Sequence, residues 1–225
     1  MSKKHQQPEV APEVVDRARF EAALAEQVVA EKEVTRHNDR ASAMRRRLPM
    51  VEVEDYTFTG TTGPVRLTDL FGDKYLLLVQ HVMFGPDWEG CCPSCTWAVD
   101  NLPANMQRLS DEGIAFAMVS QAPARKLQDW AGKRAWSHTW VSSGGTSYHY
   151  DWGWTRRDAQ GKDGPLPGYS YYLLRDGKPY LTYMTRARGV EATLPVAQIM
   201  DRTVYGRQQE WEDSPAGWPQ YPTYG

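Results

Sequence analysis

Three cysteines within five residues are the most chemically distinctive feature of the sequence. Cys91, Cys92 and Cys95 are the only cysteines in the chain of 225 residues. Cys92 and Cys95 form a C-x-x-C pair, in which one thiol can attack a substrate and the other can resolve the resulting mixed disulfide. Cysteines grouped in this way are more typical of catalytic or metal-binding sites than of the disulfide frameworks of small secreted proteins. The sequence therefore predicts a redox or metal-handling site.

The residues around the pair predict that it opens a helix. The apolar run YLLLVQHVMF at 75–84 is typical of a buried central strand, and GPDWEG at 85–90 is a loop that leads to the cysteines. A thiol at a helix N-terminus has a lowered pKa, because unpaired amides and the helix dipole favour an anion there. Pro93 is well tolerated in a first helical turn. We therefore expect Cys92 to be the nucleophile and Cys95 to be the resolving thiol.

The elements that must position this pair follow from the rest of the chain. We predict a flexible tail at 1–13, a helical arm at 14–48, the main domain at 49–207, and an irregular tail rich in proline and aromatic residues at 208–225. Strands alternate with helices and a late hairpin turns at Asp176-Gly177, which indicates an α/β domain. The expected strands are 51–60, 75–84, 114–121 and a hairpin within 170–187; the expected helices are 92–113, kinked or ended near Pro103, 124–133 and 192–207. A thioredoxin-like central mixed sheet flanked by helices fits this order.

Cys91 leaves a second chemistry open. Cys91 and Cys95 form a C-x-x-x-C pair, the spacing with which thioredoxin-fold copper chaperones bind Cu(I) together with a distant histidine. Soft thiolates select Cu(I). The candidate third ligands are His149, His138 and His81. The alternative function is therefore a Cu(I)-binding chaperone or sensor.

Several separated motifs resemble one protein family. They are RRRLPMVEVEDYTFTG (45–60), HVMFGPDWEG (81–90), CPSCTWAVDN (92–101), TWVSSGG (139–145) and TRARG (185–189). Over roughly residues 14–207 the chain resembles a bacterial family of thioredoxin-like proteins regarded as predicted dithiol–disulfide oxidoreductases. The resemblance implies a thioredoxin fold and a redox-active CPSC site, and it implies no particular substrate.

The sequence departs from that family at three positions. Cys91 stands where the family usually has Gly, Gly144 where it usually has an aromatic residue, and Arg186 where Tyr is more usual. The first departure could add a metal ligand or a second disulfide partner. Thioredoxins also place a cis-proline beside the dithiol, and Pro167, just before the hairpin, is the candidate for that position.

Other residues near the pair are accessory candidates. Trp88 could cover the dithiol, while Asp87 or Glu89 could accept a proton from Cys95. Arg186 and Arg188 could bind an anionic substrate, since guanidinium groups suit carboxylates and phosphates.

Composition limits the location and the partners. The formal net charge is −2, which does not favour nucleic acid or an anionic membrane. The chain has no apolar N-terminal segment of the secretory kind and no run of about 18 apolar residues, so we expect a cytoplasmic protein without a membrane span. Phe20, Leu24 and Val28 form an apolar stripe on the helical arm, which predicts a homodimer through this helix.

Three hypotheses follow. The first is a thiol–disulfide oxidoreductase or thiol-dependent reductase that needs no bound cofactor, only a small thiol or disulfide substrate and a reducing partner. The second is the Cu(I) protein. The third is a redox-inert scaffold whose long helix and aromatic tail bind another protein.

Overall fold

The main domain is built on one sheet of eight strands. The computed structural model describes residues 7–102, 106–157, 161 and 163–222. The strands follow the order β1-β10-β9-β4-β5-β6-β2-β3, in which the β4–β5 and β5–β6 pairs are parallel and the other pairs are antiparallel. Their bounds are β1 Val51–Glu52, β2 Thr57–Thr59, β3 Pro64–Arg66, β4 Leu76–His81, β5 Ile114–Ser120, β6 Trp140–Ser142, β9 Gly168–Arg175 and β10 Lys178–Arg186; β7 Thr155–Arg157 and β8 Asp163–Pro165 form a separate hairpin.

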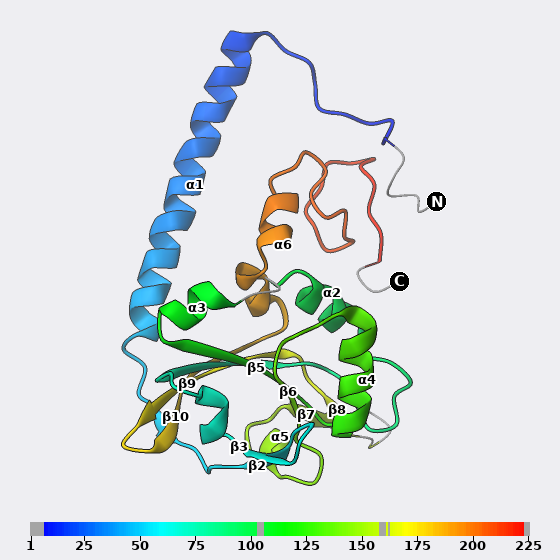
Figure 1. The fold of residues 1–225 in the computed structure, drawn as a ribbon. Helices are drawn as coiled ribbons and strands as arrows, with labels where there is room; N and C mark the ends of the chain where they lie inside the picture. Colours follow the sequence, from blue (N-terminus) through cyan, green and yellow to red (C-terminus); the bar gives the residue numbers. More distant parts are fainter. Residues whose placement is uncertain (1–6, 103–105, 158–160, 162, 223–225) are drawn as a thin grey trace. The chain divides into compact units, whose positions relative to one another are not determined.

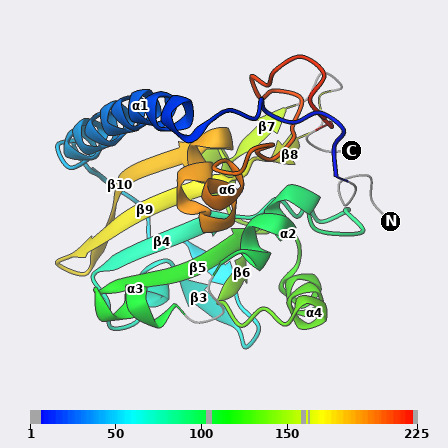
Figure 2. The ribbon, with the colours of Figure 1, turned by 90° about the horizontal axis from the view of Figure 1, so that it is seen from above.

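Short helices connect these strands. The helices are α1 Arg17–Arg45, α2 Pro93–Asp100, α3 Gln107–Asp111, α4 Ala124–Arg134, α5 Tyr148–Asp151 and α6 Pro195–Met200, with 3₁₀ turns η2 Thr68–Phe71 and η3 Ala187–Thr193. Figure 2 shows β10, β9, β4, β5 and β6 side by side, with α2 following β4 and α4 following β5. This is the thioredoxin-like mixed α/β fold that the sequence predicts.

Two hydrophobic cores lie on the two faces of the sheet. In Figure 1, α2 lies above the sheet and α5 lies below it. The first core joins Leu77 and Val79 of β4 to η2 and to Tyr148 of α5. The second core joins Val82, which follows β4, to α2 and α4, and it contains Cys91 and Cys95. Side chains alternate between faces along a strand. The dithiol thus lies on one face and α5 on the other.

Several predicted elements differ in length from the observed ones. The strand expected at 51–60 is two short strands, because Tyr56 N–H bonds Glu54 O and the Asp55 carboxylate accepts from Thr68 N–H and Oγ1. The helix expected at 192–207 is only α6. The region after Cys92 holds two helices, α2 and α3, and Pro103 between them lies outside the described residues.

By its internal contacts the chain divides into two units. One contains Met1–Leu48 and Ala197–Gly225, and the other contains Pro49–Val196. In the first unit, α1 begins at the N-cap residue Asp16, whose side chain accepts a hydrogen bond from Arg19 N–H at 2.8 Å. No helix in the described part of the chain is long and apolar enough to cross a membrane.

Candidate functional site

Cys92 lies at the N-cap of α2, at the point where β4 leads into the helix. Its amide donates to Met83 O at 3.0 Å, and its carbonyl accepts from Thr96 N–H at 2.9 Å. Pro93 is the first helical residue, where a missing N–H costs no helical hydrogen bond. The backbone on both sides of Cys92 is therefore fixed, while its side chain is only half-buried.

Cys92 has the properties of a thiolate. A hydrogen bond from the Cys95 thiol, followed by the backbone amides of Cys95 and Ser94, lowers the pKa of Cys92 to about 6, against the opposing effect of burial. The two backbone donors are free N–H groups of a helix N-terminus, where the helix dipole favours a negative charge. At neutral pH Cys92 is the charged member of the pair.

Cys95 has the opposite properties. It is 5% exposed and its Sγ accepts a hydrogen bond from Met83 N–H at 3.4 Å. The hydrogen bond that it gives to Cys92, together with burial, raises the pKa of Cys95 far above its usual range. A thiolate and a protonated thiol are thus one helical turn apart. All three cysteines are free thiols in this structure.

Cys91 differs from both. It is buried, and its thiol faces Met83 O at 3.8 Å. Burial raises the pKa of Cys91 to about 11. At neutral pH Cys91 is a protonated thiol in the core of the domain.

The loop between β4 and the cysteines is tied to α4. Lys126 Nζ donates to Pro86 O at 3.0 Å and to Trp88 O. The Trp88 ring packs so closely on Gly85 that a Cβ there would lie 2.8 Å from the ring. Trp88 also packs against the core that contains the cysteines, whereas Asp87 and Glu89 are exposed. Covering of the dithiol by Trp88 stays a prediction.

The histidine proposed as a copper ligand lies elsewhere. His149 Nδ1 hydrogen-bonds Ser143 Oγ at 2.7 Å, and its ring centroid is 5.8 Å from that of His81. Within residues 7–102, 106–157, 161 and 163–222, no three His, Cys, Asp or Glu side chains are grouped so as to hold a metal ion. The expected copper site of Cys91, Cys95 and His149 is therefore not formed. The reason is topological, since His149 belongs to α5 and its ring lies 5.7 Å from that of Tyr148, a residue of the core on the opposite face.

Two further expectations about this region need correction. The described residues contain no cis peptide bond, so Pro167 is trans and the cis-proline expected there is absent. The Arg186 guanidinium stacks 4.4 Å above the Trp154 ring and donates to Trp152 O at 2.7 Å. Because Trp154 stacks on His81, Arg186 lies beside the pair His81 and His149, which we call the histidine cluster. Arg188 is exposed and pairs with Glu191 in η3 at 3.4 Å. A role for Arg188 in binding anions stays a prediction.

Two buried polar side chains on the sheet face that carries the dithiol were not predicted from the sequence. Gln80 and Tyr169 are 4% and 2% exposed and face each other on β4 and β9. The available signal was the glutamine within the apolar run 75–84. A buried glutamine is uncommon unless its amide is used.

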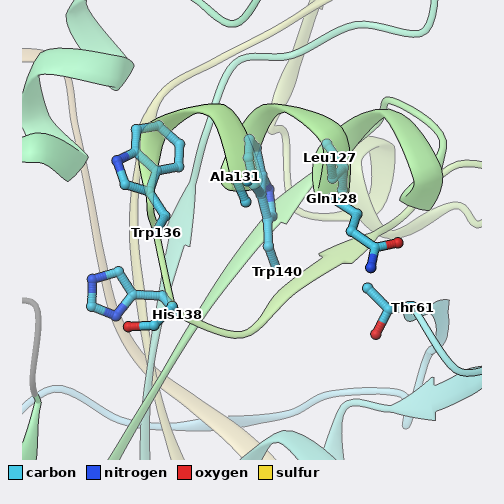
Figure 3. Close-up of a pocket in the computed structure, with 9 residues that line it drawn as sticks. Thr61, Leu127, Gln128, Ala131, Trp136, His138 and Trp140 are labelled. Atoms are coloured by element: carbon cyan, nitrogen blue, oxygen red, sulfur yellow. The ribbon is translucent and has the colours of Figure 1, made fainter.

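A separate pocket of about 270 Å³ lies between α4 and β6. In Figure 3, Trp136 lies above His138, Trp140 lies beside Ala131 of α4, and Gln128 faces Thr61. The rings of Trp136 and Trp140 are 5.5 Å apart. Both belong to or pack against the core that contains Cys91 and Cys95, but none of the cysteines lines the pocket.

Comparison with known proteins gives a family and a fold. Residues 9–224 match a family described as bacterial proteins of unknown function, DUF899. No curated protein matches the sequence.

Among solved structures, peroxidoxin BcpB from Mycobacterium tuberculosis is similar at 16% identity, with 68% of this chain and 97% of that chain covered and a TM-score of 0.50. The bacterioferritin comigratory protein of Xanthomonas campestris has 14% identity, coverage of 64% and 91%, and a TM-score of 0.49. At 16% identity, the likeness to peroxidoxin BcpB concerns the fold alone.

Proposed function

We propose that this chain, which belongs to the DUF899 family of bacterial proteins, is a thiol-dependent oxidoreductase in which Cys92 is the nucleophile and Cys95 is the resolving thiol. One observation carries the proposal: two thiols one helical turn apart have opposite protonation states, with the pKa of Cys92 lowered to about 6 and that of Cys95 raised. The attacking thiol must be a thiolate, while the resolving thiol must stay protonated until it is needed.

The reaction has two steps. The Cys92 thiolate attacks one sulfur of a small disulfide, so that a Cys92–substrate disulfide forms and the first substrate thiolate leaves. Cys95 then attacks Cys92 Sγ, the second substrate thiol leaves, and a Cys92–Cys95 disulfide remains. An external dithiol, or two monothiols in turn, reduces this disulfide and is itself oxidised to a disulfide, so that two electrons pass to the substrate without a bound metal or cofactor. The half-buried position of Cys92 suits a small substrate or an extended reducing partner.

The redox equilibrium of the dithiol tests the proposal. We expect one two-electron transition when the metal-free protein is equilibrated in graded glutathione buffers, roughly between −120 and −270 mV, the range of known thiol oxidoreductases. Free thiols are alkylated and assigned by mass spectrometry. The free thiols of Cys92 and Cys95 should disappear together, and the Cys91 thiol should be alkylated in every buffer.

Two results would contradict the proposal. One is a protein that keeps all three thiols in the most oxidising buffer. The other is a transition in which Cys91 pairs with Cys95 while Cys92 stays free, because the proposed nucleophile would then not belong to the disulfide.

We also propose that α1 pairs with α1 of a second copy. None of its 29 residues is buried, and Phe20, Leu24 and Val28 are 56%, 45% and 39% exposed along one stripe. A helix without a buried residue lacks the tertiary packing that stabilises most protein helices. Pairing two such stripes removes apolar side chains from water.

Leu24→Glu is expected to convert a dimer into a monomer, as measured by light scattering after gel filtration. A charge within the paired stripe must be desolvated or must separate the helices. The matched control is Ala22→Glu, which lies about 160° around the helix from Leu24 and should leave the dimer intact. A monomeric wild-type protein, or a dimer that survives Leu24→Glu, would overturn this proposal.

A further inference from the structure

Gln80 and Tyr169 lie on the sheet face that carries the dithiol. They are register partners on the antiparallel strands β4 and β9, so their side chains point to the same face. Along β4, Val79 belongs to the core of the opposite face, whereas Val82 packs in the core with Cys91 and Cys95. Because side chains alternate along a strand, Gln80 has the same orientation as Val82. Gln80 and Tyr169 therefore lie on the face of the sheet that carries the cysteines.

Both side chains have an unsatisfied oxygen. Gln80 Oε1 and the Tyr169 hydroxyl are buried and have no hydrogen-bond partner among the residues that the structure describes. Thr193 lies beside Tyr169, but its hydroxyl donates to Val190 O at 2.6 Å. A buried polar group without a partner is unfavourable, because it has lost its hydrogen bonds to water. Two such oxygens opposite each other are typical of a place where water or a chemical role satisfies them.

Resolution by Cys95 requires an acceptor for a proton. Cys95 is buried and protonated, and it must lose its proton as its sulfur attacks Cys92 Sγ. The carboxylates of the preceding loop, Asp87 and Glu89, are exposed to solvent. The Tyr169 hydroxyl is close enough to Cys95 for the two groups to interact electrostatically. The polar groups beneath the helix are thus on the buried side of Cys95.

We propose that Gln80 and Tyr169 hold a water molecule beneath Cys95 and that this water takes the Cys95 proton during resolution. The inference rests on the proposed function. Gln80 Oε1 and the Tyr169 oxygen each accept a hydrogen from this water, which leaves a lone pair of the water for the Cys95 S–H. The Cys95–Cys92 bond forms as the Cys92–substrate bond breaks, the Cys95 proton passes through the water to solvent, and the substrate leaves as its thiolate. Gln80 and Tyr169 are positioning residues in this scheme.

A stopped-flow experiment with a chromogenic aromatic disulfide separates the two steps. The first equivalent of coloured thiolate reports attack by Cys92, and the second reports resolution by Cys95. In Tyr169→Phe we expect the first phase to be unchanged and the second to be slowed by about 10- to 100-fold at pH 7, within or just below the usual range for assisted proton transfer. Gln80→Met should do the same. The deficit should shrink above about pH 9, where hydroxide can take the proton.

The matched control is Tyr171→Phe, which removes a hydroxyl two residues further along the same strand. The inference would be overturned if Tyr169→Phe and Gln80→Met slowed the second phase no more than Tyr171→Phe does. Equal slowing of both phases would also overturn it, because that result indicates a general structural effect. A wild-type protein that releases only one equivalent contradicts the proposed function itself, and the inference falls with it.

Discussion

Cys92→Ser is expected to abolish mixed-disulfide formation with a small disulfide probe at pH 7, whereas Cys91→Ser should leave it intact. With a pKa of about 6, about nine-tenths of Cys92 is thiolate at pH 7. With a pKa of about 11, about one Cys91 in 10,000 is thiolate. The more basic thiolate is intrinsically more nucleophilic, so each Cys91 thiolate reacts about 100-fold faster than a Cys92 thiolate. Cys92 should still react about 100-fold faster, and burial of Cys91 adds to the difference.

The measurement is acid quenching at timed intervals followed by mass spectrometry with site assignment. The rate in the wild-type protein should follow the thiolate fraction, with a midpoint near pH 6. The same experiment on Cys95→Ala should move that midpoint upward, because the hydrogen bond from Cys95 is the largest cause of the low pKa of Cys92. Cys95→Ser keeps a donor and serves as the matched control, with a smaller shift. Equal trapping in Cys92→Ser would contradict the assignment of the nucleophile.

The sequence predicts the dithiol and its surroundings well because the signals are local. An apolar run, a short loop and a proline in the first turn define a strand that leads to a helix N-terminus. The observed β4, α2 and β5 lie within one to several residues of the predictions. The low pKa of Cys92 follows from the same local geometry.

Interactions between distant segments could not be predicted in this way. The sequence offers His149 as a third Cu(I) ligand, but the packing of α5 against β4 places it beside His81, 68 positions earlier in the chain. Arg186 was expected at the dithiol and instead stacks on Trp154. The pairing of Gln80 with Tyr169 depends on the register of β4 against β9. Register is set by the whole sheet, and nothing in either strand alone specifies it.

The same histidine cluster should make the protein sensitive to mild acid. His81 lies between Tyr148 and Trp154, with ring centroids 5.7 Å and 3.7 Å away. Burial, and then electrostatic interactions with His149 and Arg186, lower the pKa of His81 well below its usual value. Burial lowers the pKa of His149 to about 4. Both imidazoles are therefore neutral in the folded protein at pH 7.

The sign of the effect follows from proton binding. Between about pH 6.5, where a histidine titrates in the unfolded chain, and about pH 4, the unfolded state binds protons that the folded state does not. Stability is therefore unaffected above about pH 7 and falls as the pH decreases below 6.5. The free energy of unfolding is expected to change by up to about 1.4 kcal/mol per pH unit for each histidine, or about 3 kcal/mol per pH unit for the two. Urea unfolding at pH 7, 6 and 5 measures it directly.

His149→Asn provides the decisive comparison. The hydroxyl of Ser143 lies 3.2 Å from Ser120 O, which can only accept, so the Ser143 oxygen accepts from His149 Nδ1–H. The asparagine amide can replace that donor but cannot titrate. We expect His149→Asn to lower stability at pH 7 through lost packing and to remove about half of the slope between pH 6.5 and pH 5. His37→Asn, on the exposed surface of α1, should change neither quantity. If His149 is a buried neutral imidazole, its removal must reduce the slope of stability against pH. An unchanged slope in His149→Asn would therefore show that the acid sensitivity has another source.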